Sequence, residues 1–536
     1  MSTGFLARPI STRVMNLAHL LTQAAQRFPE RTGLIWGQRS WTWRELDRRV
    51  QAVAAALHAH GVRKGDRILI QSRNNNAMFE TMFVAFRLGA IWVPTNFRLT
   101  PEEVGYIAKA SGAKVLIYDS VFTDHADRCR SCALNTIISI GRPRAGEIDY
   151  EGLAAGEHES FAAAAVDRDD PCWFFFTSGT TGHPKAAMLT HAQMAFVITN
   201  HLADLMPGMS EEDASIVVAP LSHGAGIHQL IQIARAVPTI LPAGERLDPR
   251  DVFRLIERHR VTNMFTVPVI VKRLVEDPSI SEFDLSSLKF VIYAGAPMYR
   301  TDQQEALRKL GKVLVQYFGL GEVTGNITVF PPHLHDPDDA VQGRIGTCGF
   351  ARTGMQISIQ DADGHELPQG ETGEICVIGP AVFAGYFNNP DANAKSFRDG
   401  WFLTGDLGHV DAEGFLYITG RASDMYISGG SNIYPREIEE KLLMHPAIRE
   451  AAVVGMPDEK WGEAGVAAVV LRPGASLDAE ELRMWMTDRI ARYKQPRDVV
   501  FFDELPKSNY GKITKKLVRA AIEERLAENC TAGTTI

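Results

Sequence analysis

The stretch Thr177-Ser178-Gly179-Thr180-Thr181-Gly182-His183-Pro184-Lys185 follows the apolar run Trp173-Phe174-Phe175-Phe176. An apolar, β-prone run of this kind predicts a buried strand. The two glycines free the backbone to turn N–H groups toward an anion, the hydroxyls add donors, and Lys185 adds a mobile positive charge. The segment therefore predicts a strand that ends in a polyphosphate-binding loop.

This loop differs from a Walker loop, because Lys185 is separated from Gly182 and is followed by Ala186 instead of Ser or Thr. A short Gly-rich stretch alone is also typical of a surface turn. The full nine-residue string resembles the phosphate loop of the adenylate-forming superfamily, which contains acyl-CoA synthetases, peptide-synthetase adenylation domains and luciferases. The resemblance implies that ATP phosphates contact Thr177, Ser178, Gly179, Thr180, Thr181, Gly182 and Lys185.

Residues 316–322 (Gln-Tyr-Phe-Gly-Leu-Gly-Glu) resemble a second signature of this family, an aromatic-Gly-x-Thr/Ser-Glu run. The resemblance implies that Tyr317, Phe318 and Gly319 contact adenine and that Glu322 is a catalytic residue and the Mg²⁺ ligand. Gly321 stands where the family has a hydroxyl that touches the α-phosphate, so the backbone or Thr324 would supply that contact. On this basis Gly321→Thr is expected to improve ATP affinity or to be neutral.

The turn Gly295-Ala296-Pro297 follows an apolar strand and consists of small residues, which permit a ligand to approach closely. By resemblance this turn lines the adenine pocket. A strand end that needs tight packing is equally compatible with the sequence.

Two later segments extend the resemblance. Residues 401–406 and 414–437 are similar to the ribose-binding and hinge segment, in which Asp406 would accept hydrogen bonds from ribose hydroxyls and Arg421 would bind near the ribose and phosphate. Residues 506–513 (Pro-Lys-Ser-Asn-Tyr-Gly-Lys-Ile) resemble the C-terminal segment whose lysine, here Lys512, activates the carboxylate as a catalytic residue. Four motifs in the family's order span residues 30 to 520 and identify the chain as a family member.

The resemblance also implies sites for the thiol and the acid. Gly429, Gly430 and Trp461 match positions that line the pantetheine tunnel, although core packing explains Trp461 equally well. His223, within residues 220–226, matches the gate of the acyl pocket, although a histidine beside glycines is often structural. Glycines near His223 and in residues 319–328 suggest a roomy pocket, and the lack of a basic residue there favours a monocarboxylate.

The rest of the chain predicts an α/β fold. Capping boxes at Thr42 and Thr100 open helices, and apolar strands at 67–71 and 114–118 alternate with them, which implies parallel-rich sheets covered by helices. From Pro435 the pattern changes to a small, mobile α+β unit. We therefore expect an N-terminal ATP- and acyl-binding domain at 1–421 and a C-terminal lid domain at 422–536. The hinge would lie at 421–424, around Ser423, and a frayed tail would follow about residue 528.

Composition limits the function classes. The chain has 536 residues and a net charge of −8, which argues against a nucleic-acid surface. It contains no apolar run long enough to span a bilayer, no apolar signal core at its first residues and no peroxisomal tripeptide at its last, so we expect a cytoplasmic enzyme. Among six cysteines, Cys129 and Cys132 form one C-x-x-C pair, which is more typical of reduced thiols than of a zinc site.

We therefore expect an ATP-dependent acid–CoA ligase that uses ATP, Mg²⁺ and coenzyme A on a small carboxylic acid, without nucleic acid; a homodimer is left open. The alternative is a stand-alone adenylation enzyme that loads a carrier protein. A luciferase-like oxygenase is a third option. The family's functional residues argue against a binding protein without catalysis, since the chain retains Lys185, Glu322, Asp406, Arg421 and Lys512.

Overall fold

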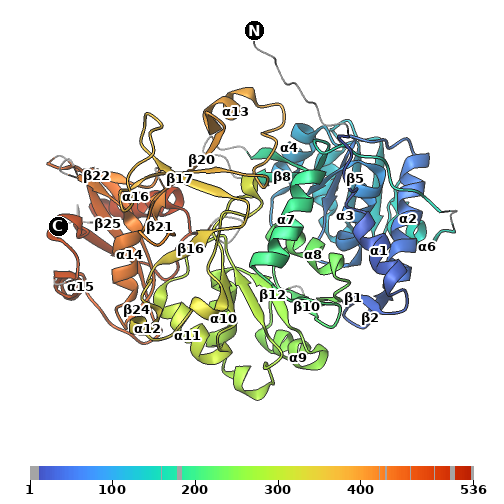
Figure 1. The fold of residues 1–536 in the computed structure, drawn as a ribbon. Helices are drawn as coiled ribbons and strands as arrows, with labels where there is room; N and C mark the ends of the chain where they lie inside the picture. Colours follow the sequence, from blue (N-terminus) through green and yellow to red (C-terminus); the bar gives the residue numbers. More distant parts are fainter. Residues whose placement is uncertain are drawn as a thin grey trace, which may run out of the picture.

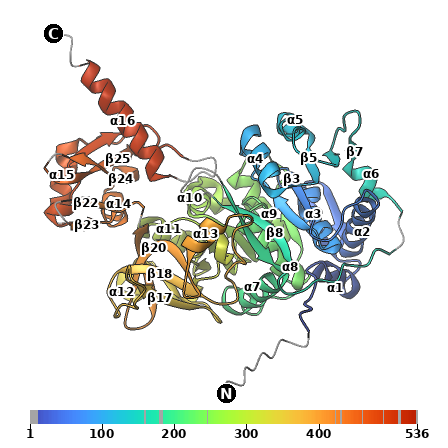
Figure 2. The same ribbon diagram turned by 90° about the horizontal axis from the view of Figure 1, so that it is seen from above.

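The computed structural model describes residues 11–157, 160–177, 184–244, 246–421, 423–428, 431–458, 460–487, 489–507 and 513–532. Within these residues the chain forms four sheets (Figure 1). Three sheets lie in the first 421 residues, and the fourth belongs to the C-terminal part, which stands apart from the rest in Figure 2.

Two seven-stranded, mostly parallel sheets form the larger part. The first has the order β14-β13-β12-β10-β11-β1-β2 and the second the order β7-β6-β5-β3-β4-β8-β9; only β1–β2 and β8–β9 pair antiparallel. The first sheet contains β1 (Thr32–Trp36), β2 (Arg39–Thr42), β10 (Ser215–Val217), β11 (Thr239–Leu241), β12 (Asn263–Thr266), β13 (Phe290–Tyr293) and β14 (Leu314–Gln316). The second contains β3 (Arg67–Gln71), β4 (Ile91–Pro94), β5 (Val115–Asp119), β6 (Thr136–Ile140), β7 (Ile148–Asp149), β8 (Pro171–Thr177) and β9 (Lys185–Thr190).

A third, antiparallel sheet follows in the chain, with the order β15-β16-β21-β20-β18-β17 and with β19 paired to β20. It contains β15 (Thr328–Val329), β16 (Thr347–Ala351), β17 (Gln356–Gln360), β18 (Gly373–Ile378), β19 (Phe397–Arg398), β20 (Trp401–Val410) and β21 (Phe415–Arg421). The sequence analysis did not anticipate this sheet. The connections from β16 to β17, β17 to β18, β19 to β20 and β20 to β21 contain no helix, as antiparallel pairing allows, whereas a short helix lies between β15 and β16 and another between β18 and β19.

The C-terminal sheet has the order β23-β22-β25-β24, with β26 paired parallel to β25. Its strands are β22 (Tyr426–Ser428), β23 (Ser431–Ile433), β24 (Ile448–Asp458), β25 (Gly462–Leu471) and β26 (Asp498–Phe501). Separate apolar clusters cover its two faces, one built around Ile438 and Leu442 and the other around Val518 and Ile522.

Helices cover the parallel sheets. The helices of the larger part are α1 (His19–Arg27), α2 (Trp43–Ala59), α3 (Asn76–Leu88), α4 (Pro101–Ser111), α5 (Thr123–Cys129), α6 (Tyr150–Ala155), α7 (His191–Asp204), α8 (Gly224–Ala234), α9 (Pro249–His259), α10 (Pro268–Glu276), α11 (Arg300–Leu310), α12 (Asp339–Gln342) and α13 (Pro390–Ser396). The C-terminal part adds α14 (Pro435–Leu443), α15 (Ala479–Thr487) and α16 (Lys515–Ala532). No helix within the described residues combines the length and apolar character needed to cross a bilayer.

Local sequence signals placed many of these elements correctly. Both predicted capping boxes form: the Thr42 hydroxyl accepts the Glu45 N–H while the Glu45 side chain accepts the Thr42 N–H, and Thr100 and Glu103 do the same. The tail that the sequence predicts after about residue 528 overlaps the end of α16, which continues to Ala532. The helix-forming residues of 515–532 contain no glycine or proline, and Val518 and Ile522 anchor them to the C-terminal sheet.

The parallel strands of the first sheet position the site. Strands β10, β12, β13 and β14 run in the same direction, so their carboxyl ends meet at one edge. The chain segments that follow them carry His223, the turn at Gly295 and the run from Tyr317 to Glu322. Ligands of open α/β sheets bind at this edge, so the topology gathers three of the predicted site segments there.

Candidate active site

Glu322 connects the first two sequence motifs. It lies in the short 3₁₀ helix η3 (Gly321–Val323), which packs against β8 and β9, and its side chain is buried. The Thr177 hydroxyl donates to Glu322 Oε1 at 2.8 Å and the Tyr386 hydroxyl donates to the same oxygen at 2.9 Å. The end of the phosphate-loop strand and the predicted metal ligand are therefore within hydrogen-bonding distance.

Lys185 starts β9 directly opposite Thr177 in the β8–β9 hairpin. Its Nζ lies 4.5 Å from the centroid of the Tyr386 ring, a cation–π contact. A carboxylate, two hydroxyls and an ammonium thus meet at one place. A carboxylate oxygen suits Mg²⁺, and a lysine suits phosphate, so these residues fit a magnesium–nucleotide. The predicted phosphate contacts Ser178, Gly179, Thr180, Thr181 and Gly182 lie outside the described residues.

Tyr386 is a site residue that sequence reasoning missed. It follows the antiparallel sheet's strand β18 by eight residues, far along the chain from both motifs, and no local pattern marks it. Burial and the Glu322 carboxylate raise its pKa above the usual tyrosine range, so the hydroxyl stays protonated and donates. Tyr386 therefore holds the orientation of Glu322.

We expect Tyr386→Phe to lower the rate of acid-dependent ATP–pyrophosphate exchange about tenfold and to raise the Mg²⁺ concentration for half-maximal exchange, since a hydrogen bond to a charged group is worth about 1.5–3 kcal/mol. The matched control is Tyr417→Phe, which removes the hydroxyl that donates to Asp411 at 3.2 Å outside the site. An unchanged Mg²⁺ requirement in Tyr386→Phe would contradict the orienting role.

The adenine-side residues lie at the expected strand ends. Gly295, with a φ of +81°, and its neighbours Ala296 and Pro297 are exposed at the end of β13, so tight packing of this strand end does not explain them. Phe318 is half-buried, and its N–H donates to the Thr328 hydroxyl at 3.1 Å. That hydroxyl donates in turn to the Cys348 carbonyl at 2.6 Å. The loop after β14 is thereby joined to the antiparallel sheet.

Asp406 and Arg421 pair across β20 and β21 of that sheet. Arg421 Nε donates to Asp406 Oδ1 at 3.1 Å; the carboxylate is nearly buried and the arginine is exposed. Burial raises the pKa of Asp406, and the Arg421 charge partly offsets this effect. The pair presents one carboxylate and one guanidinium together, as the resemblance implied for ribose and phosphate.

Gly321 has no space for a larger side chain. A Cβ built on it would lie 2.7 Å from Phe175 Cδ1 and 2.9 Å from Thr177 Cγ2, closer than real contacts. Thr324 does not replace the missing donor either, because its buried hydroxyl donates to the Val323 carbonyl at 2.6 Å. The structure thus argues against a neutral or beneficial Gly321→Thr: the ring of Phe175 occupies the space that the hydroxyl would need.

We now expect Gly321→Thr to lower acyl-adenylate formation by tenfold or more, roughly the 1–3 kcal/mol cost of overpacking. The double variant Gly321→Thr/Phe175→Ala should recover part of the loss, because it removes the ring that the new side chain meets. Pyrophosphate exchange for the four members of this mutant cycle measures the coupling. Additive losses would contradict steric conflict as the cause.

The glycines around the predicted acyl gate are closely packed. A Cβ on Gly224 would lie 2.6 Å from Phe265 Cζ, one on Gly226 would lie 2.1 Å from the Leu221 carbonyl oxygen, and one on Gly319 would lie 2.3 Å from the Gly325 carbonyl carbon. These glycines allow close packing of backbone and rings, so they do not support the expectation of a roomy pocket. His223 itself is half-buried, 2.8 Å from the Ser222 hydroxyl through Nδ1, and its ring meets Phe175 edge-on at 5.6 Å.

The predicted thiol-side and carboxylate-activating residues are only partly described. Trp461 is 48% exposed beside the start of β25, with Lys460 over its ring, so the alternative of core packing does not hold. Gly429, Gly430 and Lys512 lie outside the described residues. Of the predicted hinge, Ser423 is exposed and donates to Asp424 Oδ1 at 3.3 Å.

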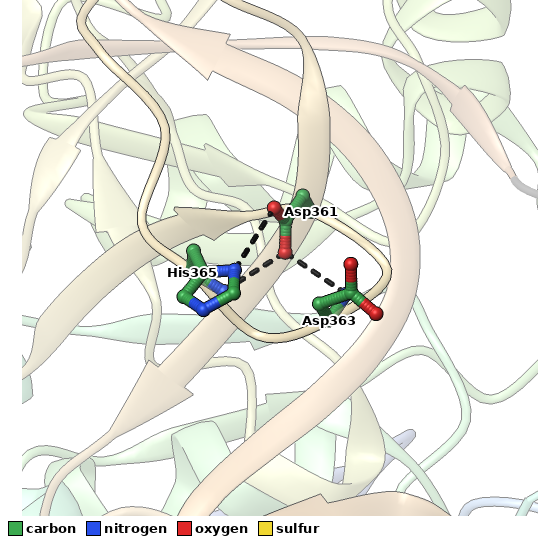
Figure 3. Close-up of side chains that lie close together, drawn as sticks. All are labelled: Asp361, Asp363 and His365. Atoms are coloured by element: carbon green, nitrogen blue, oxygen red, sulfur yellow. Dashed lines mark hydrogen bonds and ion pairs between the residues drawn. The ribbon is translucent and has the colours of Figure 1, made fainter.

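One group of potential metal ligands lies elsewhere. Figure 3 shows Asp361, Asp363 and His365 in the turn after β17. Asp361 Oδ1 accepts the backbone N–H groups of Asp363 and His365 at 2.9 and 2.8 Å. These bonds close the turn, which accounts for the acidic residues without a metal ion.

Two family models, curated relatives and solved structures match this chain. The model of the AMP-binding enzyme family matches residues 21–387, and that of the AMP-binding enzyme C-terminal domain matches residues 437–512. A feruloyl-CoA synthase of an Amycolatopsis species is 36% identical, over 92% of this chain and 96% of its own. An indoleacetate–CoA ligase of Aromatoleum aromaticum is 35% identical, over 95% and 99%. The solved structure of an o-succinylbenzoate–coenzyme A synthetase of Bacillus subtilis, in complex with ATP and magnesium, has a TM-score of 0.81, with 31% identity over 93% and 99% of the two chains.

Proposed function

The chain belongs to the AMP-binding enzyme family and is an AMP-forming acid–CoA ligase that uses ATP, Mg²⁺ and CoA. From this premise we propose that its acid carries a ring. We also propose that the residues described above serve two successive half-reactions. In the first, a carboxylate oxygen attacks the α-phosphorus of ATP and pyrophosphate leaves. In the second, the CoA thiol attacks the acyl carbon and AMP leaves. Because a carboxylate has no good leaving group, adenylation is the activating step.

The observation that supports the proposed nucleotide site is the hydrogen bonding of Thr177 and Tyr386 to Glu322, with Lys185 against the Tyr386 ring. In the proposed arrangement Lys185, Thr177 and residues 178–182 hold the β- and γ-phosphates. Glu322 would hold Mg²⁺, which neutralises charge on the phosphate oxygens when bound. The protein's own contribution is to position the reactants and to stabilise the developing charge.

The remaining residues receive roles from the same arrangement. Asp406 would accept hydrogen bonds from the ribose, with Arg421 beside it, and the exposed turn at Gly295, Ala296 and Pro297 would border adenine with Tyr317, Phe318 and Gly319. Lys512 would contact the carboxylate and α-phosphate in the first half-reaction. Gly429, Gly430 and Trp461 would border the pantetheine arm in the second.

A ring-bearing acid is favoured by two observations. Two relatives of about 35% identity are named for feruloyl and indoleacetate substrates. The side chains next to the proposed gate are aromatic as well: Phe175 meets His223 edge-on, and Phe265 lies against Gly224. Stacked or edge-on contacts with such rings favour a planar acyl group.

The test is a panel of acids scored for pyrophosphate release that requires ATP, acid and CoA. Feruloyl-type and indole acids should exceed alkanoic acids of equal carbon number in kcat/KM. Replacing CoA by a carrier protein that bears phosphopantetheine separates the alternative function, since a carrier-loading enzyme would transfer the acyl group to the protein and not to free CoA. Release without acid dependence would exclude both functions.

The domain division is also part of this proposal: residues 1–421 bind ATP and acid, and residues 422–536 form the lid. It is supported by β21, which ends at Arg421 in one sheet, and β22, which starts at Tyr426 in another. A cytoplasmic location is proposed because the five cysteines with described side chains are all unpaired. A homodimer is a further proposal, which light scattering of the purified chain would test.

A further inference from the structure

Buried polar side chains gather around the ring of Tyr317. Arg352 follows β16 and is 1% exposed, and its Cζ lies 6.0 Å from the Tyr317 ring centroid. His201 of α7 meets the same ring edge-on at 6.3 Å. Burying a guanidinium costs several kcal/mol unless partners compensate it, so the partners of Arg352 decide whether it serves stability alone.

Arg352 is incompletely paired within the described part of the chain. Its Nη2 lies 3.0 Å from His201 Nδ1, which also lies 3.1 Å from the Val197 carbonyl oxygen. Burial keeps the pKa of His201 well below its usual value, so the ring is neutral and does not compensate the guanidinium charge. Asp204 Oδ2 lies 3.9 Å from Nε, but Asp204 already accepts from the Thr353 N–H and hydroxyl at 2.8 Å each. The Nε and Nη1 groups are buried, and no described residue accepts a hydrogen bond from either.

A third buried atom without a described partner, on Asn326, lies close by. Asn326 is fully buried and donates through Nδ2 to Asn200 Oδ1 at 3.0 Å, while its own Oδ1 has no partner among the described residues. The N–H of Arg352 donates to the carbonyl of Ile327, the next residue, so both orphan groups belong to one small region. Buried polar groups without a partner require an explanation, and a ligand that supplies the missing partners is one.

Contacts connect this region to the proposed acyl gate. Gly224, next to His223, packs against Phe265, whose ring stacks on Tyr317 at a centroid distance of 6.1 Å and an interplanar angle of 29°. Tyr317 directly precedes the adenine-side Phe318 and contacts Arg352 on its own account. Two aromatic rings thus lie in series between the gate and the buried guanidinium.

We propose that Arg352 determines the acid specificity of this enzyme by binding an oxygen acceptor at the end of the acid remote from the reacting carboxylate, such as a ketone, phenolate or second carboxylate. The inference rests on the proposed ligase function and names its substrate class. An oxygen there supplies the acceptor that Nε and Nη1 lack, whereas an alkyl end leaves both N–H groups unpaired. Because the guanidinium is fully buried, binding of this oxygen requires a movement of the side chains that cover it, Tyr317 among them.

The expectation of a monocarboxylate rested on residues 223–226 and 319–328, which contain no lysine or arginine, and therefore did not include Arg352. The basic group comes from a segment about 30 residues further along the chain, and the antiparallel sheet brings it beside Tyr317. The expectation of a monocarboxylate, which rested on the absence of a basic residue from those two stretches, is therefore not supported.

The test uses pairs of acids that are equal in shape. One pair is 4-acetylcinnamate and 4-isopropylcinnamate, and the other is 6-oxoheptanoate and 6-methylheptanoate. Acid-dependent ATP–pyrophosphate exchange gives kcat and KM for the wild type, Arg352→Met, Arg352→Lys and Asp204→Asn. The ATP-induced rise in melting temperature reports, for each variant, whether the nucleotide site is folded.

The wild type should favour the oxygen-bearing acid of a pair by about tenfold to hundredfold in kcat/KM. In Arg352→Met, the ratio of kcat/KM between the two acids of a pair should approach one through a change in KM, while kcat for the alkyl acid is retained. Arg352→Lys should restore part of the preference for the oxygen-bearing acid. Asp204→Asn should increase it, because the carboxylate that lies 3.9 Å from Nε is removed. A wild-type ratio near one, or the same ratio in all folded variants, overturns the inference; if Arg352→Met does not fold, the Lys and Asn variants decide. Failure of every acid to support exchange would instead overturn the proposed function.

Discussion

Lys512→Ala should lower the rate of acyl-adenylate formation by about a hundredfold to a thousandfold. An effect of this size follows the removal of one group that stabilises a developing charge. The same variant should form acyl-CoA from supplied acyl-adenylate at close to the parental rate. The reason is that the positive charge is needed only while the carboxylate attacks the α-phosphorus. Lys512 occupies the lysine position of the motif at residues 506–513.

The two half-reactions must be measured separately, by acid-dependent pyrophosphate exchange and by thioester formation from synthetic acyl-adenylate. Lys516→Ala is the matched control, because Lys516 is an exposed lysine of α16 four residues further along. It should leave both rates unchanged. Equal loss of both half-reactions in Lys512→Ala would show that the lysine supports the fold or the nucleotide site in general.

Ser423→Pro should leave the rate of adenylation unchanged and lower the rate of thioester formation by roughly a hundredfold. A loss of this size is expected when domain closure no longer positions the reactants. Ser423 lies between the last strand of the antiparallel sheet and the first of the C-terminal sheet. Proline fixes φ near −65°, so it prevents the backbone rotation that a moving lid needs. The turn itself should survive, because its bonds to the Arg421 carbonyl come from the N–H groups of Asp424 and Met425.

Ser423→Ala is the control for this experiment. It removes the hydroxyl that donates to Asp424 but leaves the backbone free, so both half-reactions should proceed at the parental rate. If Ser423→Pro also converts acid to acyl-CoA at the parental rate, the lid does not pivot at this residue, and the boundary after Arg421 is misplaced.

The sequence predicted those parts of the fold that depend on local signals. The helix at Thr42 begins where the Thr–Glu capping box places it, and the strand at Arg67–Gln71 has the predicted bounds. The antiparallel sheet escaped prediction because its short strands are held by partners distant in sequence, and their patterning is less regular than that of the helices. Tertiary pairing, and not local propensity, decides such strands.

The same distinction applies to the site. Thr177, Lys185 and Glu322 could be proposed from the sequence because each lies in a contiguous motif. Tyr386 and Arg352 could not, because their contacts with Glu322 and Tyr317 exist only in the folded chain. Gly321 shows a third case: its missing hydroxyl was visible in the sequence, but the Phe175 ring that fills the space was not.

The contact between Gly319 and Gly325 has a consequence for engineering this enzyme toward new acids. In a saturation library of the loop after β14, few clones with a substitution at Gly319 or Gly325 would be active. A Cβ on Gly319 would meet the Gly325 backbone, and one on Gly325 would meet the Tyr317 ring. Randomising Phe265 and Tyr317 is more promising, because their rings stack on each other, so a smaller side chain at one position can be compensated by a larger one at the other. Selection for altered acid range should therefore enrich paired exchanges at these two aromatic positions while both glycines stay invariant.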